Sequence, residues 1–252
     1  MSVRKIDYLN FDTINSVDTN NDVFDTVFTL NQKYTNIKKI YLKNCEIPIG
    51  FSNIRSSNNS NILRFVLNGV SYNVTITSAN YTSISTLLTA LNASILSAIT
   101  STGFTFVLSV NTSNNIIITS TGAFSSYSII QTTLSNILNI NSAINQTAGT
   151  YTSSFIYNLG YDTYIQMSFY NGPSIFSSQG NNVYSALKVP LNTNAYNILF
   201  YSTDRGEYDQ ALTISDNNFI LSQLRIIIYD RFGYLLNNGN LEYSFTLAIE
   251  YE

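Results

Sequence analysis

The side chains that carry most enzyme chemistry are scarce in this sequence. It contains no histidine, so the usual general base near neutral pH and the commonest metal ligand are both missing. A Ser-His-Asp or Cys-His site is therefore excluded. The best remaining cluster of charged groups is Glu207 and Asp209, next to Arg205 and Gly206. A solvated loop tip is the simpler interpretation of this cluster, so we assign no catalytic residue and predict that the protein is not an enzyme.

Metal and cofactor motifs are also incomplete. Residues 18–22 begin like a calcium loop, but Val23 stands where the glycine belongs and Thr29 where the bidentate glutamate belongs. No phosphate-binding or dinucleotide-binding glycine motif occurs. The single cysteine, Cys45, lies in a β-type run and is interpreted as a buried structural thiol. We expect no metal site and no cofactor.

Composition narrows the class of protein further. The 252 residues are 44% hydrophobic, enough to bury a substantial core. Twelve basic against 15 acidic side chains give a net charge of -3 without a basic block, so nucleic-acid binding is not expected. Polar residues interrupt every apolar run, which argues against a membrane span, and the first ten residues lack the apolar core of a secretion signal. One cysteine fits a reducing compartment.

The charged residues divide the chain into three zones. No Asp, Glu, Lys or Arg occurs from Phe65 to Tyr161. The first 64 residues carry eight basic and six acidic side chains, and residues 162–252 carry four and nine. The edges near Arg64 and Asp162 suggest a module inserted into another domain.

The neutral zone has a mixed pattern. Asn68-Gly69 between apolar runs 63–67 and 70–76 predicts a hairpin, since both turn residues accept positive φ. Apolar residues at three- and four-residue steps predict a helix over 84–99, with Thr82 or Ser83 as N-cap. A second hairpin over 104–110 and 116–119 and a short helix near 130–138 are also predicted.

The flanking zones show β patterns. Strands are predicted at 24–30 and 37–47, and then at 164–170, 183–189, 195–201, 220–229 and 241–251. In the last of these, Phe245 and its apolar neighbours at alternate positions share one face, which indicates one buried side. Strands separated by Gly, Asn, Asp and Ser clusters favour a sandwich or barrel.

Three stretches, in this order, resemble penton and minor capsid proteins of virophages and large DNA viruses. They are IKKIYLKNCEIPIGFSNI, then VSYNVTITSANYTSISTLLTALNASI followed by FTFVLSVNTSNNIIITS, and finally LSQLRIIIYDRFGYLLNNGNLEYSFTLAIEYE. Together they cover somewhat over half of the chain. The stretch 170–210 has no counterpart in this resemblance.

The resemblance implies a mainly β fold, a single jelly-roll sandwich with an inserted mixed α/β module of hairpin, helix, hairpin and helix. The expected division is a jelly roll from residues 1–61 and 146–252, in eight or nine strands from 20–50 and 150–252, with the module at 62–145. It further implies a structural capsid protein of the virion, assembled inside the host cell, whose pentamers occupy the vertices beside a major capsid protein. The alternative is a receptor- or glycan-binding jelly roll, such as a fibre head or lectin-like module, which a glycan array and a sizing column would distinguish.

Overall fold

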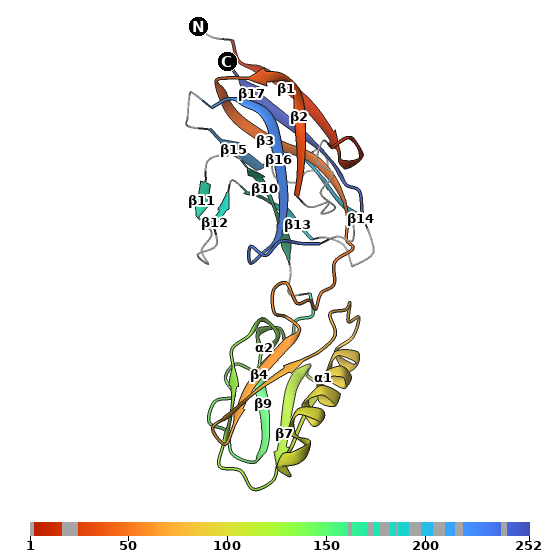
Figure 1. Ribbon diagram of the computed structural model, residues 1–252, viewed down its shortest axis with the longest axis vertical. Coiled ribbons are helices and arrows are strands. Elements are labelled where there is room, and N and C mark those ends of the chain that lie inside the picture. The colour runs from red at the N-terminus through yellow and green to blue at the C-terminus, as the bar shows by residue number, and fades with distance from the viewer. Residues whose placement is uncertain are drawn as a thin grey trace. The chain divides into compact units, whose positions relative to one another are not determined.

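The chain folds into two compact units, each with its own hydrophobic core. Unit 1 combines Met1–Phe51 with Asp162–Glu252, and unit 2 is Ser52–Tyr161 (Figure 1). The computed structural model describes residues 3–16, 25–160, 163–170, 174–176, 182–184, 186–191, 198–203, 210–214, 219–237 and 241–252. Unit 2 extends beyond the expected 62–145 on both sides, because Ile54 joins its core and the strand at 149–156 pairs within it.

Unit 1 is a sandwich of two antiparallel sheets. The first has the order β1-β17-β3-β14, with β15 also paired to β3, and the second has the order β13-β10-β16-β2. Each sheet interleaves strands from the two ends of the chain, which is the Greek-key arrangement of a jelly roll and confirms the predicted fold class. The strands of the first sheet are β1 (Lys5–Asp12), β17 (Ser244–Tyr251), β3 (Ile37–Pro48), β14 (Ile198–Ser202) and β15 (Gln210–Thr213); those of the second are β13 (Ala186–Pro190), β10 (Tyr164–Tyr170), β16 (Leu221–Asp230) and β2 (Asp25–Tyr34).

The closing strand β17 packs as its alternation predicts. Phe245 is 1% exposed, and its ring stacks on Phe11 of β1 with centroids 4.8 Å apart and meets the edge of Phe28 of β2 at 5.7 Å. These contacts join both sheets through one aromatic cluster. The strand begins at Ser244, so Leu241, expected within it, lies before the strand and is exposed.

The turn after β16 is stabilised by one side chain. Asp230 Oδ1 accepts hydrogen bonds from the backbone N–H groups of Phe232 and Tyr234, and Gly233 takes the positive φ of 86° that the turn requires. The side chain of Asp230 thus holds the backbone of the turn from Asp230 to Tyr234. A separate hairpin is formed by β11 (Ser174–Phe176) and β12 (Asn182–Tyr184).

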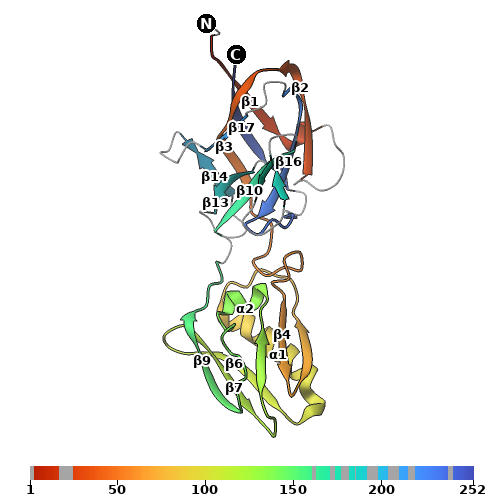
Figure 2. The ribbon, with the colours of Figure 1, turned by 90° about the vertical axis from the view of Figure 1, so that its left-hand side faces the viewer.

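Unit 2 contains two three-stranded antiparallel sheets and two helices (Figure 2). The predicted hairpin turn is present, with Asn68 and Gly69 both at positive φ. Ser83 caps the long helix by accepting a hydrogen bond from the backbone N–H of Thr86. The elements are β4 (Ile62–Leu67), β5 (Val70–Thr75), β8 (Tyr127–Ile130), β6 (Thr105–Val110), β7 (Asn115–Thr121), β9 (Gly149–Ile156), α1 (Ile84–Ile99) and α2 (Thr133–Leu138), with short 3-10 turns at Thr13–Asn15 in unit 1 and Thr100–Thr102 in unit 2.

Three strands correct the sequence-based expectations. β1 lies before residue 20, where no strand was expected. β8 ends at Ile130, where the second helix was expected to begin, so α2 starts later, at Thr133 after its cap Thr132. β9 falls within the 146–252 segment assigned to the jelly roll, but its partner is β7 of unit 2.

Candidate functional site

The sequence motifs singled out for chemistry do not come together in a site. Residues 204–209, with Glu207 and Asp209, and residues 18–23 lie outside the described part of the chain. Thr29 pairs with Gln223 in the β2–β16 ladder. Cys45 is fully buried in β3, opposite Phe245. Among the described residues, no group of three or more His, Cys, Asp or Glu side chains is placed to hold a metal ion, and no helix is long and apolar enough to cross a membrane.

One buried carboxylate that pairs with a cation is Glu250, on the outer face of β17. It is 5% exposed, accepts a hydrogen bond of 2.9 Å from the Tyr41 hydroxyl, and lies 3.0 Å from a guanidinium nitrogen of Arg4. Both partners belong to strands or strand ends beside β17. The arrangement ties the start of the chain to the sheet, and we interpret it as structural.

Unit 1 has a hollow between β1 and β2, the outermost strands of the two sheets. Its volume is about 630 Å³. Phe11, Phe28 and Tyr34, 8%, 4% and 3% exposed, form its floor, with Leu9 and Leu30 half-buried beside them. The residues that line it are Tyr8, Leu9, Asn10, Phe11, Asp12, Asn15, Phe28, Thr29, Leu30, Asn31, Gln32 and Tyr34. The hollow therefore lies over core aromatics that are themselves almost fully covered.

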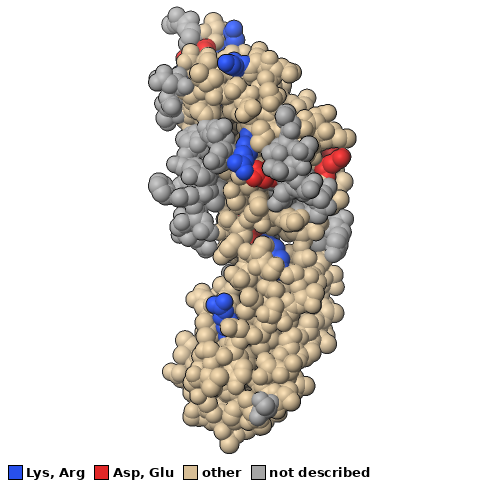
Figure 3. All heavy atoms as spheres, viewed as in Figure 1, with Lys and Arg blue, Asp and Glu red and all other residues tan. Residues whose placement is uncertain are grey.

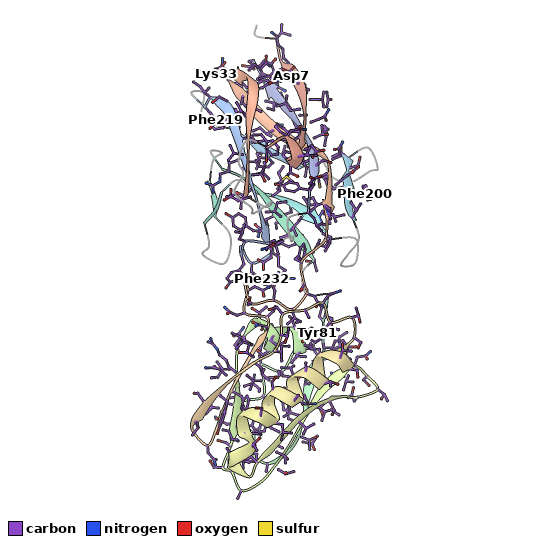
Figure 4. The ribbon with its side chains drawn as sticks, turned by 45° about the vertical axis from the view of Figure 1, so that its right-hand side comes forward. Asp7, Lys33, Tyr81, Phe200, Phe219 and Phe232 are labelled. Atoms are coloured by element: carbon purple, nitrogen blue, oxygen red, sulfur yellow. The ribbon has the colours of Figure 1, made fainter. Side chains whose placement is uncertain are left out.

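The opposite margin of unit 1 presents apolar side chains outward. β14 pairs with β3, and its residues alternate between buried Leu199 and Tyr201 and exposed Ile198 and Phe200, 48% and 43% exposed. Phe200 lies at the flank of unit 1 in Figure 4. The run Ile-Leu-Phe-Tyr was predicted as a strand, but its apolar residues on both faces are also the signal of an exposed apolar margin, which the sequence reasoning missed.

The surface of unit 2 carries few charged side chains, since no Asp, Glu, Lys or Arg occurs from Phe65 to Tyr161. The face of it that Figure 3 shows is nearly all uncharged. One of its strand edges is closed by a side chain, because the Asn92 amide of α1 donates to the carbonyl oxygen of Leu108 and accepts from its N–H, both at 2.8 Å. The edge of β8 is closed by backbone bonds from Tyr127 to Gln146 and from Ile129 to Ala143.

The edge of β9 is open within the described residues. In an antiparallel ladder, successive residues direct their backbone groups to opposite sides. The backbone groups of Leu108 point away from β7, to Asn92, so those of its partner Ile118 point away from β6, toward Tyr151 of β9. On β9, the backbone groups of the neighbouring Thr150 and Thr152 therefore point away from β7, to the outer edge. An uncharged open edge of this kind can accept another strand.

Comparison with known proteins finds a likeness in structure alone. No family model matches the chain, and no curated protein matches it in sequence. The crystal structure of a selenomethionine-labelled mavirus penton protein aligns with a TM-score of 0.52 at 11% identity, covering 97% of this chain and 99% of that one. The chain shares the fold of a penton protein. Because the match spans both units, the whole arrangement of a jelly roll carrying an insert is common to the two proteins.

Proposed function

We propose that the chain is a structural capsid protein of a virion, a penton protein whose pentamers occupy the vertices of an icosahedral shell beside a major capsid protein. The observation that carries the proposal is the match over nearly the full length of both chains to a penton protein. At 11% identity the likeness supports a shared fold. The capsid role is proposed because the jelly roll and its insert occur together in both proteins.

The surface of the protein is compatible with a role in assembly rather than in catalysis. The chain lacks histidine, and three of the described carboxylates form ion pairs, Glu250 with Arg4, Glu252 with Lys38 and Asp25 with Arg225. Exposed apolar side chains and an open uncharged strand edge are features that neighbouring subunits cover. A capsid subunit needs such surfaces and needs no active site.

The test is the position of the protein in assembled particles. Particles made with the chain and its shell protein would be reconstructed by electron microscopy with a small tag inserted at the Asn111 to Asn114 turn of unit 2. We expect density for five tagged copies around each fivefold axis. Density elsewhere in the shell, or particles that assemble fully with closed vertices when the chain is omitted, would contradict the proposal.

A further inference from the structure

We propose that β5 of one copy of the chain pairs with β9 of a second copy, so that neighbouring subunits share a β-sheet through unit 2. This inference rests on the proposed pentamer and names a contact that closes it. A fivefold ring requires two different patches on each subunit, because each contact between neighbours is head to tail. Unit 2 supplies two such patches, the open edges of β5 and β9, which belong to different sheets.

Each sheet of unit 2 has one outer strand that the chain itself closes and one that it leaves open. In the sheet β5-β4-β8, residues 143 and 146 close the edge of β8, and in the sheet β6-β7-β9 the amide of Asn92 closes the edge of β6. The strands that remain are β5 and β9. Figure 2 shows β9 at one side of unit 2 and β4, the strand to which β5 pairs, toward the other side.

The backbone of β5 offers hydrogen-bonding groups at its outer edge. The N–H of Ile129 in β8 bonds outside the sheet, so the backbone groups of its partner Phe65 point toward Tyr72 of β5. Those of Ser71 and Asn73, on either side of Tyr72, therefore point away from β4. Both residues are exposed, and no hydrogen bond to either from another described residue lies at this edge.

The open stretch of β9 matches that of β5 in length and pattern. Its outward backbone groups belong to Thr150 and Thr152, two residues apart like Ser71 and Asn73. Antiparallel pairing of Asn73 with Thr150 and of Ser71 with Thr152 satisfies the N–H and the C=O of all four residues. The stretches also end together, because β5 begins at Val70 after its turn and the register of β9 shifts beyond Thr152.

The side chains near the two edges favour the same pairing. Tyr72 and Tyr151 are half-buried residues that pack against the core of unit 2. The antiparallel register places them directly opposite each other, and aromatic cross-strand pairs stabilise a sheet. Neither strand contains a charged residue, so neither edge carries the Lys that commonly prevents pairing with another chain.

The absence of charge on β5 and β9 also indicates which strand each accepts. A charged strand would lose part of the hydration of its side chains and gain no opposite charge in return. An uncharged strand loses no such hydration, and each open edge of unit 2 finds one in the other edge of a second copy. Pairing of β9 with β9, or of β5 with β5, would instead give a two-fold dimer.

Cross-linking of cysteine variants of the full chain tests the pairing. Asn73→Cys and Thr150→Cys place thiols at exposed positions that the register sets opposite each other. Cys45 is fully buried, so the parent is the unreactive control. With a short bis-maleimide at the highest soluble concentration, we expect dimers from an equimolar mixture of the two single variants and a ladder ending at five copies from the double variant. Each single variant alone should remain uncross-linked, and melting temperatures equal to that of the parent show that all variants are folded.

A proline in β9 tests whether the contact is a shared sheet. Thr152→Pro removes an N–H that points away from β7, so the ladder between β7 and β9 keeps its bonds. Thr152→Val is the matched control, because it keeps the N–H and a β-branched side chain. In the double cysteine variant we expect Thr152→Pro to abolish the ladder of cross-linked copies and Thr152→Val to retain it. A ladder that persists with the proline would overturn the shared sheet.

The outcomes separate this contact from the stoichiometry. Dimers from either single variant alone would mean that like edges meet, and the inference would fail. An uncross-linked mixture would also overturn it, while the position of the tagged chain in assembled particles would still judge the pentamer. A ladder that ends at another number would support the pairing of β5 with β9 and contradict fivefold closure.

Discussion

Phe245 lies at the centre of the aromatic cluster that joins the two sheets of unit 1. Replacing it with Asp removes the stacking on Phe11 and leaves a carboxylate at a position that is 1% exposed. Loss of the ring alone costs about 3 to 5 kcal/mol, and an unpaired buried charge costs more, against a total stability of about 5 to 15 kcal/mol. We expect Phe245→Asp to unfold unit 1 at ambient temperature.

The measurement is thermal unfolding followed by near-ultraviolet circular dichroism. Thr246→Asp is the matched control, because the neighbouring side chain points to the outer face, where its hydroxyl donates to the Asn10 Oδ1 at 2.7 Å. Its expected cost is about 1 kcal/mol. A parent-like melting temperature for Phe245→Asp would show that the aromatic cluster is not the core of the sandwich.

Tyr127 of unit 2 is a second residue whose burial has a measurable consequence. Its hydroxyl is buried with no hydrogen-bond partner among the described residues. Burial, and after it the charge of Tyr151, raises the pKa of Tyr127 from 10.0 to about 12. The unfolded chain then releases this proton at a lower pH than the folded chain, so the associated stability is fully present below pH 10 and is lost as the pH rises toward 12.

Tyr127→Phe therefore separates the two effects. At neutral pH we expect unit 2 to be unchanged or more stable by up to about 1 kcal/mol, since an unsatisfied hydroxyl is removed. From about pH 9 to about pH 11 the advantage of the variant should grow by about 1 kcal/mol. Urea unfolding at the two pH values measures both. An advantage that stays constant with pH would indicate that the Tyr127 hydroxyl is solvated.

At the scale of elements, unit 2 depends on how its strand edges are closed. Asn92 occupies both backbone groups of Leu108 at the outer edge of β6. Asn92→Ala leaves a half-buried donor and acceptor unpaired, which we expect to cost roughly 1 to 3 kcal/mol. Thr89→Ala is the control on the same helix, because its exposed hydroxyl donates to the Ser85 carbonyl one turn away and does not reach a strand edge among the described residues. If urea unfolding shows the same small loss of stability for Asn92→Ala and Thr89→Ala, water replaces the Asn92 amide at the edge of β6.

Elements whose own sequence fixes them were predicted to within a few residues. α1 begins and ends at Ile84 and Ile99 as predicted, because a Ser83 cap and an unbroken apolar period act locally. β17 has a strict alternation and its predicted face is buried. The Asn-Gly hairpin is equally local.

The missed strands depend on partners far away in the sequence. In β1, the inward face includes Asp7, whose carboxylate accepts hydrogen bonds from Tyr251 and Gln32, both at 3.1 Å. Because Asp7 is charged, the inward face of β1 does not read as apolar in the sequence, and the alternation was not recognised. In β9, the inward Ser153 is buried, and its hydroxyl oxygen accepts a hydrogen bond from the backbone N–H of Ile116. A polar residue on the inward face interrupts the apolar alternation, so the strand was not recognised in the sequence. The hollow between β1 and β2 arises from tertiary packing, which no local pattern records.

At the scale of the whole molecule, the division into two cores suggests that the insert is separable. The core of unit 1 includes Ile49 and Phe51 just before the insert, and that of unit 2 includes Ile54 just after it begins. β3 and β10, which flank the insert, belong to facing sheets, and such sheets pack about 10 Å apart. A linker of about six flexible residues reaches that far.

We therefore expect that replacing residues 52–161 by about six Gly and Ser residues leaves unit 1 folded. The reason is that every buried strand partner of β3 and β10 lies within unit 1, so the deletion removes no ladder from either sheet. The shortened chain should unfold in one cooperative step with a strand-type circular dichroism spectrum, and residues 52–161 alone should retain the helical signal of α1. Hydrogen exchange supplies the decisive reading, because protection of the β3 amides in the shortened chain requires an intact sheet. A second version with a linker of about twelve residues checks for strain in the short linker. Loss of β3 protection in both versions would mean that the jelly roll needs its insert in order to fold.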